Sequence, residues 1–180
     1  MKNVGLRPEI PRYAVTTDSV VIGFNQEELF VVLIRRKNPP FEGMWALPGG
    51  FVEENEDLEE AALRELKEET RLELDRMVQV GAFGKPGRDP RGRVISIAYL
   101  ALRPLEELKV DAGDDAKEAG LFSLNRLPPL AFDHQAVIAE GCKKLLWLWD
   151  QRKASPFPFL EEKIVKVLKE RLGEFLEQLS

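Results

Sequence analysis

The stretch from Gly50 to Leu72 constrains this 180-residue chain more than any other, because it joins a glycine turn to a helix rich in acids. Asp57 with Glu60 three residues later is typical of a capping box at a helix start. Apolar residues then recur at steps of three and four, which predicts a helix over Leu58–Thr70 with one face directed to a core. A turn and an amphipathic helix are therefore expected side by side.

Four glutamates of this stretch are predicted to lie close together. Glu65, Glu68 and Glu69 fall one turn apart on a single helix face, and Glu56 precedes the cap and can reach the same region. Like charges at such spacing repel by roughly 0.2–0.5 kcal/mol per pair unless a cation neutralises them. Carboxylate oxygens suit magnesium or manganese, with positions left for water and phosphate oxygens. We expect the four acids to converge on a divalent cation.

A solvated acidic helix face is the alternative explanation, and for the acids alone it is the commoner one. The turn Leu47–Gly50 directly upstream favours the metal site, because its two glycines allow carbonyls and amides to come close to a metal or a phosphate. Turn and acids together predict a metal-dependent hydrolase that acts on a diphosphate.

The same residues resemble the Nudix box, G-x5-E-x7-R-E-U-x-E-E-x-G-U, in which U is aliphatic. All fixed positions from Gly50 to Leu72 match except one: Arg71 stands where the box has glycine, so the helix is expected to end without the usual glycine stop. The resemblance covers roughly Tyr13 to Trp149. It implies the α/β class, with a Nudix-type α/β/α sandwich built on a mixed sheet. The expected C-terminal helical extension lies beyond the resemblance.

What the resemblance implies about the site can be carried over residue by residue. It implies a magnesium site, with manganese a possible substitute, whose ligands are the carbonyl of Gly49 and the side chains of Glu65, Glu68 and Glu69. Glu65 is also a possible general base. Arg64 and Glu56 are expected to form an ion pair that holds loop and helix in register, a role that orients the ligands without taking part in the chemistry.

A loop rich in arginine, Gly84–Arg93, is the second informative feature. Arg88, Arg91 and Arg93 alternate with glycine and proline, which predicts a rigid cationic edge suited to phosphate. An ordinary charged hairpin connection is the alternative. The loop and its Pro86 resemble those of Nudix enzymes of the ADP-ribose pyrophosphatase group and of related regulators.

Residues beside the glycine turn are further candidates for substrate binding. Arg35 and Arg36 end a predicted strand there and are expected to contact phosphate or ribose. Phe41 and Trp45 could stack on an adenine ring, although a place in the core is the default for Trp45.

An acidic residue well after the box often completes the metal site or activates water in proteins that this chain resembles. We expect Glu118 to do so, with Asp114 and Asp115 as alternatives in the same predicted loop, 112–119. His134 is the sole histidine, so a histidine-dependent triad is excluded and the residue is expected to be a polar group at a helix start.

The remaining pattern predicts a mixed sheet covered on both faces. The predicted strands are 13–24 and 29–35, joined as a hairpin, then 78–83, 94–102 and 121–124. Asp133 is expected to cap a helix that runs to about Trp149.

Composition and length bound the organisation. With 44% hydrophobic residues we expect a domain over 1–155, followed over 156–180 by one amphipathic helix. Its apolar stripe either packs against its own domain or pairs with a partner helix, and we expect a homodimer. A net charge of -5 argues against nucleic acid as a partner. The single cysteine excludes an intrachain disulfide, and with no secretion signal or membrane span the chain is expected in the cytoplasm.

The function that these features favour is magnesium-dependent hydrolysis of the pyrophosphate bond of a nucleoside diphosphate derivative, with ADP-ribose giving AMP and ribose 5-phosphate. Two alternatives stay open. One is a Nudix-type sensor that regulates NAD metabolism, which would carry a winged helix where this chain has one short helix. The other is an enzyme that removes oxidised nucleoside triphosphates.

Overall fold

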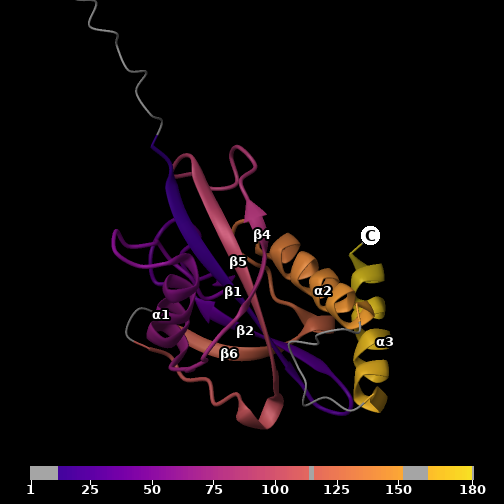
Figure 1. Cartoon of the computed structure of the whole chain (residues 1–180). Helices are drawn as coiled ribbons and strands as arrows, with labels where there is room; N and C mark the ends of the chain where they lie inside the picture. The colour runs from indigo at the N-terminus through magenta and orange to yellow at the C-terminus, as the bar shows by residue number, and fades with distance from the viewer. Residues whose placement is uncertain (1–11, 114–115, 152–161, 180) are drawn as a thin grey trace, which may run out of the picture.

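The fold is a six-stranded mixed sheet between helices, seen in a computed structural model that describes residues 12–113, 116–151 and 162–179 (Figure 1). The strands are β1 (Ala14–Phe24), β2 (Leu29–Arg35), β3 (Trp45–Ala46), β4 (Val78–Phe83), β5 (Val94–Pro104) and β6 (Glu118–Ser123). The helices are α1 (Leu58–Thr70), α2 (His134–Asp150) and α3 (Glu162–Gln178), with short 3-10 turns at Leu105–Glu107 and Leu124–Arg126. The expected sandwich is confirmed.

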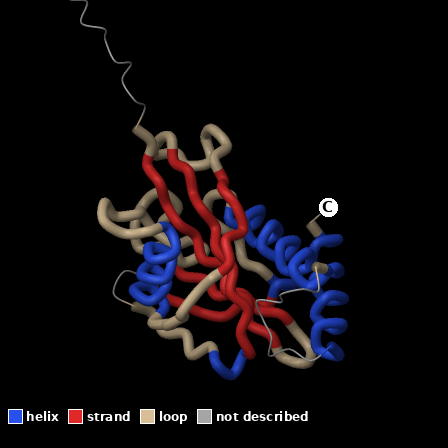
Figure 2. Tube along the Cα trace, viewed as in Figure 1, coloured by secondary structure: helices blue, strands red, loops and turns tan. Residues whose placement is uncertain are grey.

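Strand β1 lies at the centre of this sheet, and both of its faces are covered. It pairs in parallel with β5 along its whole length, and the order across the sheet is β3-β2-β1-β5-β4, with β6 on β2. Val20 and Ile22 pack toward α2 and α3, while Val21 packs toward α1. Figure 2 shows α1 on one side of the strands and α2 with α3 on the other. Burial on both faces explains why the second half of β1, from Val20 onward, is apolar on both sides of the sheet.

The two ends of β1 have different neighbours. Near its C-terminal end β1 pairs with β2 at three positions, from Ile22 to Phe24. Near its start the neighbour is the segment Pro48–Val52: the amides of Thr17 and Ser19 donate to the carbonyls of Gly50 and Pro48, and Val52 donates to the carbonyl of Val15. The glycine turn is therefore held against the sheet by backbone hydrogen bonds.

Most predicted elements are confirmed within two residues, but β6 is not. It begins at Glu118, inside the stretch predicted as an acidic loop, because six residues from Glu118 to Ser123 pair in antiparallel register with β2. Asp133 does occupy the position before α2, but its side chain makes no cap hydrogen bond and binds Arg88 instead.

Helix α3 packs on its own chain. The apolar stripe predicted as a partner surface buries Leu168, Leu172 and Phe175, each at most 2% exposed, in the core that α2 also covers. This stripe is therefore occupied within one molecule. The boundary proposed at residue 155 falls outside the described residues. None of the helices that the structure describes has the length and apolar character needed to cross a membrane.

Helix α1 ends on a strained residue. Arg71 adopts the left-handed conformation, with φ 59° and ψ 10°, and its amide donates to the carbonyl of Lys67 at 2.8 Å. The helix therefore stops with the geometry of a glycine stop although no glycine is present.

Replacing Arg71 by glycine should stabilise the protein. The left-handed region costs a residue with a Cβ roughly 1–2 kcal/mol, so we expect the free energy of unfolding to rise by about 1 kcal/mol in Arg71→Gly. Urea denaturation would measure it. Arg71→Ala, which keeps the Cβ and removes only the exposed side chain, is the control; equal stability of the two variants would contradict the strain.

Candidate active site

The glycine turn lies between β1 and α1 with no room for larger residues. A Cβ on Gly49 would lie 2.0 Å from the carbonyl oxygen of Thr17, and one on Gly50 would lie 2.3 Å from a carboxylate oxygen of Glu65. The Gly49 amide donates to Oε2 of Glu69 at 2.8 Å. Because Gly49 lies opposite Asp18 at a position whose backbone groups point away from β1, its carbonyl also faces outward.

Arg64, in the middle of α1, gathers one carboxylate that precedes the helix and two from its second half. Its Nε and Nη2 bind the two oxygens of Glu56 at 2.9 and 2.7 Å, and Nη1 reaches Glu65 at 2.9 Å and Glu68 at 3.0 Å. The Arg64 hydrogen bonds, helped by the amide of Glu53, lower the pKa of Glu56 to about 2. The ion pair between Arg64 and Glu56 is thus present in the structure.

The four acids expected to converge lie around Arg64 and the glycine turn, and their role as metal ligands stays a prediction. Across residues 12–113, 116–151 and 162–179, no three acidic, histidine or cysteine side chains gather closely enough to hold an ion. Arg64 is the physical reason, because one guanidinium draws Glu56, Glu65 and Glu68 to itself while Glu69 bonds the turn.

The residues nevertheless fit a divalent metal. Glu65 and Glu69 flank the turn from α1, the Gly49 carbonyl faces outward, and these oxygens are the ligand type that magnesium prefers. Gly50 leaves space that only the Glu65 carboxylate occupies.

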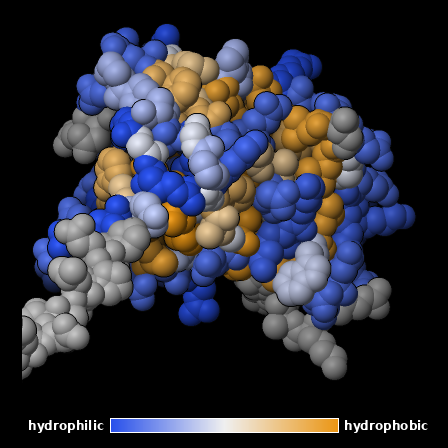
Figure 3. All heavy atoms as spheres, turned by 90° about the horizontal axis from the view of Figure 1, so that it is seen from above, coloured by the Kyte–Doolittle hydropathy of each residue, from blue (hydrophilic) through white to orange (hydrophobic). Residues whose placement is uncertain are grey.

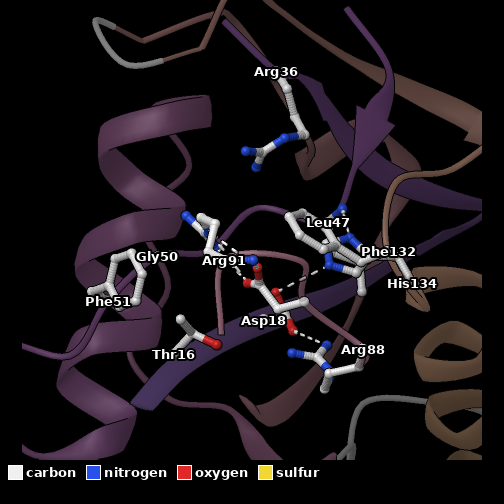
Figure 4. Close-up of a pocket in the computed structure, with 12 residues that line it drawn as sticks. Thr16, Asp18, Arg36, Leu47, Gly50, Phe51, Arg88, Arg91, Phe132 and His134 are labelled. Carbon is white, nitrogen blue, oxygen red and sulfur yellow. Dashed lines mark hydrogen bonds and ion pairs between the residues drawn. The ribbon is translucent and has the colours of Figure 1, made fainter. Parts of the chain in front are cut away.

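A cavity of about 120 Å³ opens beside the turn (Figure 4). It is lined by Thr16, Asp18, Arg36, Leu47, Gly49, Gly50, Phe51, Arg88, Asp89, Arg91, Phe132 and His134. The side chains come from β1, the end of β2, the turn, the β4–β5 loop and the start of α2, so segments distant in sequence form one wall.

Two cations, Arg36 and Arg91, face this cavity. Their guanidinium carbons lie 4.9 and 5.7 Å from the centre of the Phe132 ring, and that of Arg91 lies 5.0 Å from the ring of Phe51. Burial, followed by repulsion from Arg91, lowers the pKa of Arg36. Figure 4 shows both side chains reaching toward the same space. Two guanidinium groups held close together on aromatic faces suit an anion with several oxygens.

Arg91 pairs with Asp89 at 2.7 Å, and Arg88, which also lines the cavity, is paired with carboxylates too. Its Nε and Nη2 form two hydrogen bonds to Asp133 at 3.0 and 2.6 Å, and Nη2 lies 3.7 Å from Asp18. Its side chain is 5% exposed. Burial acts to lower the pKa of Arg88, but the bonds to Asp133 and the charge of Asp18 outweigh it and raise the pKa. This arginine joins the β4–β5 loop to the start of α2.

Besides the box residues Glu56, Arg64, Glu65, Glu68 and Glu69, four other predicted site residues lie outside the cavity lining: Arg35, Trp45, Arg93 and Glu118. Arg35 and Glu118 form an ion pair with each other at 2.8 Å across β2 and β6. The guanidinium of Arg93 lies 5.7 Å from the ring centre of Tyr13 and donates to the carbonyl of Gly84. Trp45 packs edge-on against Phe122, with ring centres 4.4 Å apart. Asp114 and Asp115, the alternatives to Glu118, are outside the described residues.

Asp18, Phe132 and His134 are among the residues of the cavity wall that sequence reasoning did not assign to the site. Asp18 and His134 are 6% and 4% exposed, and Phe132 has a left-handed φ of 52°. The signal for Asp18 was available, since a lone carboxylate within an apolar strand needs a partner.

Exposed aromatic residues lie at the cavity and beside it, because Phe51 lines it and Phe41 packs edge-on against Phe132. Phe51 and Phe41 are 47% and 37% exposed. Seen from the end where β1 begins, hydrophobic residues form patches between hydrophilic ones (Figure 3).

Comparison with known proteins agrees with this architecture. A model of the NUDIX domain matches residues 12–141. An ADP-ribose pyrophosphatase of Methanocaldococcus jannaschii is 50% identical over 127 residues, which cover 71% of this chain and 72% of that protein.

Two further similar proteins are named for ADP-ribose. The ADPR responsive transcriptional repressor NtrR of Acinetobacter baylyi is 31% identical over 143 residues, covering 77% of this chain and 57% of the repressor. The crystal structure of the NUDIX domain of Shewanella oneidensis NrtR complexed with ADP ribose has a TM-score of 0.71 and 31% identity, covering 76% of this chain and 90% of that chain.

The ion pair of Arg64 can be tested through acid titration. In Arg64→Gln we expect the pKa of Glu56 to rise from about 2 toward its ordinary value near 4.3. Because the folded pKa is depressed, the stability that the pair contributes is present above about pH 4.3 and is lost as the pH falls toward 2. NMR titration of the glutamate carboxyl carbons would follow it. The exposed Arg126→Gln variant should leave Glu56 unchanged; an unaltered pKa in Arg64→Gln would exclude this cause.

Proposed function

We propose that this chain, which belongs to the Nudix family, is a pyrophosphohydrolase that cleaves ADP-ribose to AMP and ribose 5-phosphate. The observation that carries the proposal is a pair of cations, Arg36 and Arg91, beside a turn flanked by the box glutamates. A 50% identical relative is an ADP-ribose pyrophosphatase. Anion-binding arginines next to metal-ligand carboxylates suit a substrate with two adjacent phosphoryl groups.

Magnesium is the proposed cofactor, with manganese as a substitute. Glu65, Glu68, Glu69 and the Gly49 carbonyl would hold it, and Arg64 would keep Glu56 against the base of the helix. When bound, the ion supplies neutralisation of the phosphate charge and a lowered pKa for the attacking water.

The side chains of the protein orient the substrate and accept the proton that the attacking water loses. Arg36 and Arg91 bind phosphoryl oxygens of the substrate, which fixes the bridging bond near the turn. Glu65, which lies against Gly50, accepts the proton of water as water attacks one phosphorus and the bond to the bridging oxygen breaks. The β4–β5 loop is kept in place by Arg88 and Asp133.

The proposed partner is a nucleotide substrate. Retention of all the box acids supports an enzyme rather than a sensor, although similarity to the Acinetobacter baylyi repressor keeps a regulator as the second candidate. A homodimer and a cytoplasmic location stay predictions; the burial of the α3 stripe within one chain removes the argument for pairing through that face.

Hydrolysis of ADP-ribose with magnesium tests the proposal directly. We expect AMP and ribose 5-phosphate in equal amounts, and a fall in kcat of about 10²- to 10⁴-fold in Glu65→Gln if its carboxylate is the base. Quantified products by chromatography would measure it, with NADH and oxidised triphosphates as competing substrates. Preference for a triphosphate would contradict the ADP-ribose proposal and favour an enzyme that removes oxidised nucleoside triphosphates.

Substitutions of the arginines in the β4–β5 loop should affect activity according to whether the arginine lines the cavity. Arg91→Gln removes a cation from the cavity, so we expect kcat/KM for ADP-ribose to fall about 10- to 100-fold, the range for a hydrogen bond to a charged group. Arg93→Gln, two residues away and outside the cavity lining, is the matched control and should stay within about twofold of the wild type. Equal losses would mean that the loop acts only through its net charge.

A further inference from the structure

A buried polar network links β1, the glycine turn and the start of α2. His134 accepts a hydrogen bond at Nδ1 from the backbone amide of Leu47, at 2.8 Å. Its Nε2 lies 3.5 Å from Oδ1 of Asp18. Figure 4 shows the ring between these two partners, on the side of the cavity opposite α1. The chemistry assigned to the box uses neither His134 nor Asp18.

The contact with Leu47 determines the protonation state of the ring. An amide can donate only to a nitrogen that carries no proton, so Nδ1 is bare and a neutral ring holds its proton on Nε2, toward Asp18. Burial lowers the pKa of His134 despite the nearby Asp18 carboxylate, which keeps the ring neutral. In a protonated ring Nδ1 would carry a hydrogen and could no longer accept from the Leu47 amide, so two N–H donors would face each other.

The neighbours of the ring leave it little freedom. Phe132 stacks on His134 with ring centres 5.3 Å apart and planes at 29°. Oδ2 of Asp18 accepts a hydrogen bond from Ser96 on β5 and lies 3.7 Å from Arg88. Ser96 of the sheet therefore fixes the Asp18 carboxylate, and this carboxylate in turn lies beside Nε2 of the imidazole.

Leu47 connects this network to the residues that would hold the metal. It lies two positions before Gly49, whose amide bonds Glu69, and the carbonyl of Pro48 between them accepts from Ser19. The turn is therefore hydrogen-bonded to His134 through Leu47 and to Glu69 of α1 through Gly49. A shift of Leu47 would move the Gly49 carbonyl relative to the α1 carboxylates.

We propose that His134 is a positioning residue: its Nδ1 sets the place of Leu47–Gly50 so that the Gly49 carbonyl and the α1 carboxylates can share one cation, while Asp18 orients the ring. This inference rests on the proposed function. It concerns the acceptor atom at Nδ1, so variants that keep or remove that acceptor separate it from a packing role.

Binding of manganese alone, without substrate, is the first test. His134→Phe keeps a ring and removes the acceptor, and we expect the Mn²⁺ affinity to fall about 10- to 100-fold, as for other groups that orient metal ligands. His134→Asn returns an oxygen acceptor near the position of Nδ1 and should recover the affinity to within about threefold. Electron paramagnetic resonance of free Mn²⁺ gives both values.

A destabilised variant of the same helix is the control. Val137→Ala opens space in the core one turn further along α2 and should lower the melting temperature without weakening Mn²⁺ binding. If His134→Phe behaves like Val137→Ala, with loss of stability alone, the positioning role is refuted.

Kinetics with ADP-ribose provide a second readout. We expect kcat of His134→Phe to fall about 10- to 100-fold while KM changes less than about threefold, because Arg36 and Arg91 keep their places. A wild-type protein that binds Mn²⁺ but leaves ADP-ribose intact would overturn the proposed substrate, and the manganese measurement would still decide the role of His134.

The wild-type protein decides the matter if neither variant folds. An N–H···N hydrogen bond transmits a scalar coupling between its two nitrogens, so NMR of uniformly ¹⁵N-labelled protein should show one between the Leu47 amide and His134 Nδ1. Its presence supports the acceptor role, and its absence overturns the proposal.

Discussion

The structure depends on the backbone hydrogen bonds by which Pro48–Val52 takes the place of β2 beside the start of β1. A chain segment that joins a sheet in this way has its amides and carbonyls fixed by the strand, and every second residue points away from it. Gly49 is such a residue, which is why its amide meets Glu69 on α1. The site forms where the sheet opens and a turn fills the gap.

The arginines fall into two groups: some hold elements of the fold together through carboxylates, and others lie at the cavity. Arg64 and Arg88 each hold carboxylates with several nitrogens, one at the base of α1 and the other between the β4–β5 loop and α2. A buried guanidinium requires such partners, because an unpaired charge in a protein interior is costly. Arg36 and Arg91 differ in their place: they lie over the Phe132 ring at the cavity, where Arg91 is also paired with Asp89 and its charge lowers the pKa of Arg36.

Much of the fold could be predicted because local patterns agree with the tertiary structure. The capping box at Asp57 and the apolar spacing of α1 are both present, and the hairpin of β1 and β2 has the expected bounds. The start of β6 could not be predicted, since acidic residues have low strand propensity and only pairing with β2 places Glu118 in the sheet. Asp133 illustrates the same limit: its side chain binds the buried Arg88 and makes no cap hydrogen bond to α2, although its position and residue type predict a helix cap.

The sequence by itself determined the family, the position of α1 and the identity of the box acids, because these rest on spacing along one helix and one turn. Only the tertiary structure decided which arginines face the cavity. Arg88, Arg91 and Arg93 are equivalent as a pattern. Their roles differ because Arg88 is bound by Asp133 and Arg93 lies beside Tyr13, both distant in sequence, while Arg91 pairs with Asp89 at the cavity. His134 follows the same reasoning: its place beside Leu47 and Asp18 depends on contacts across 87 residues or more of chain, which no local spacing records.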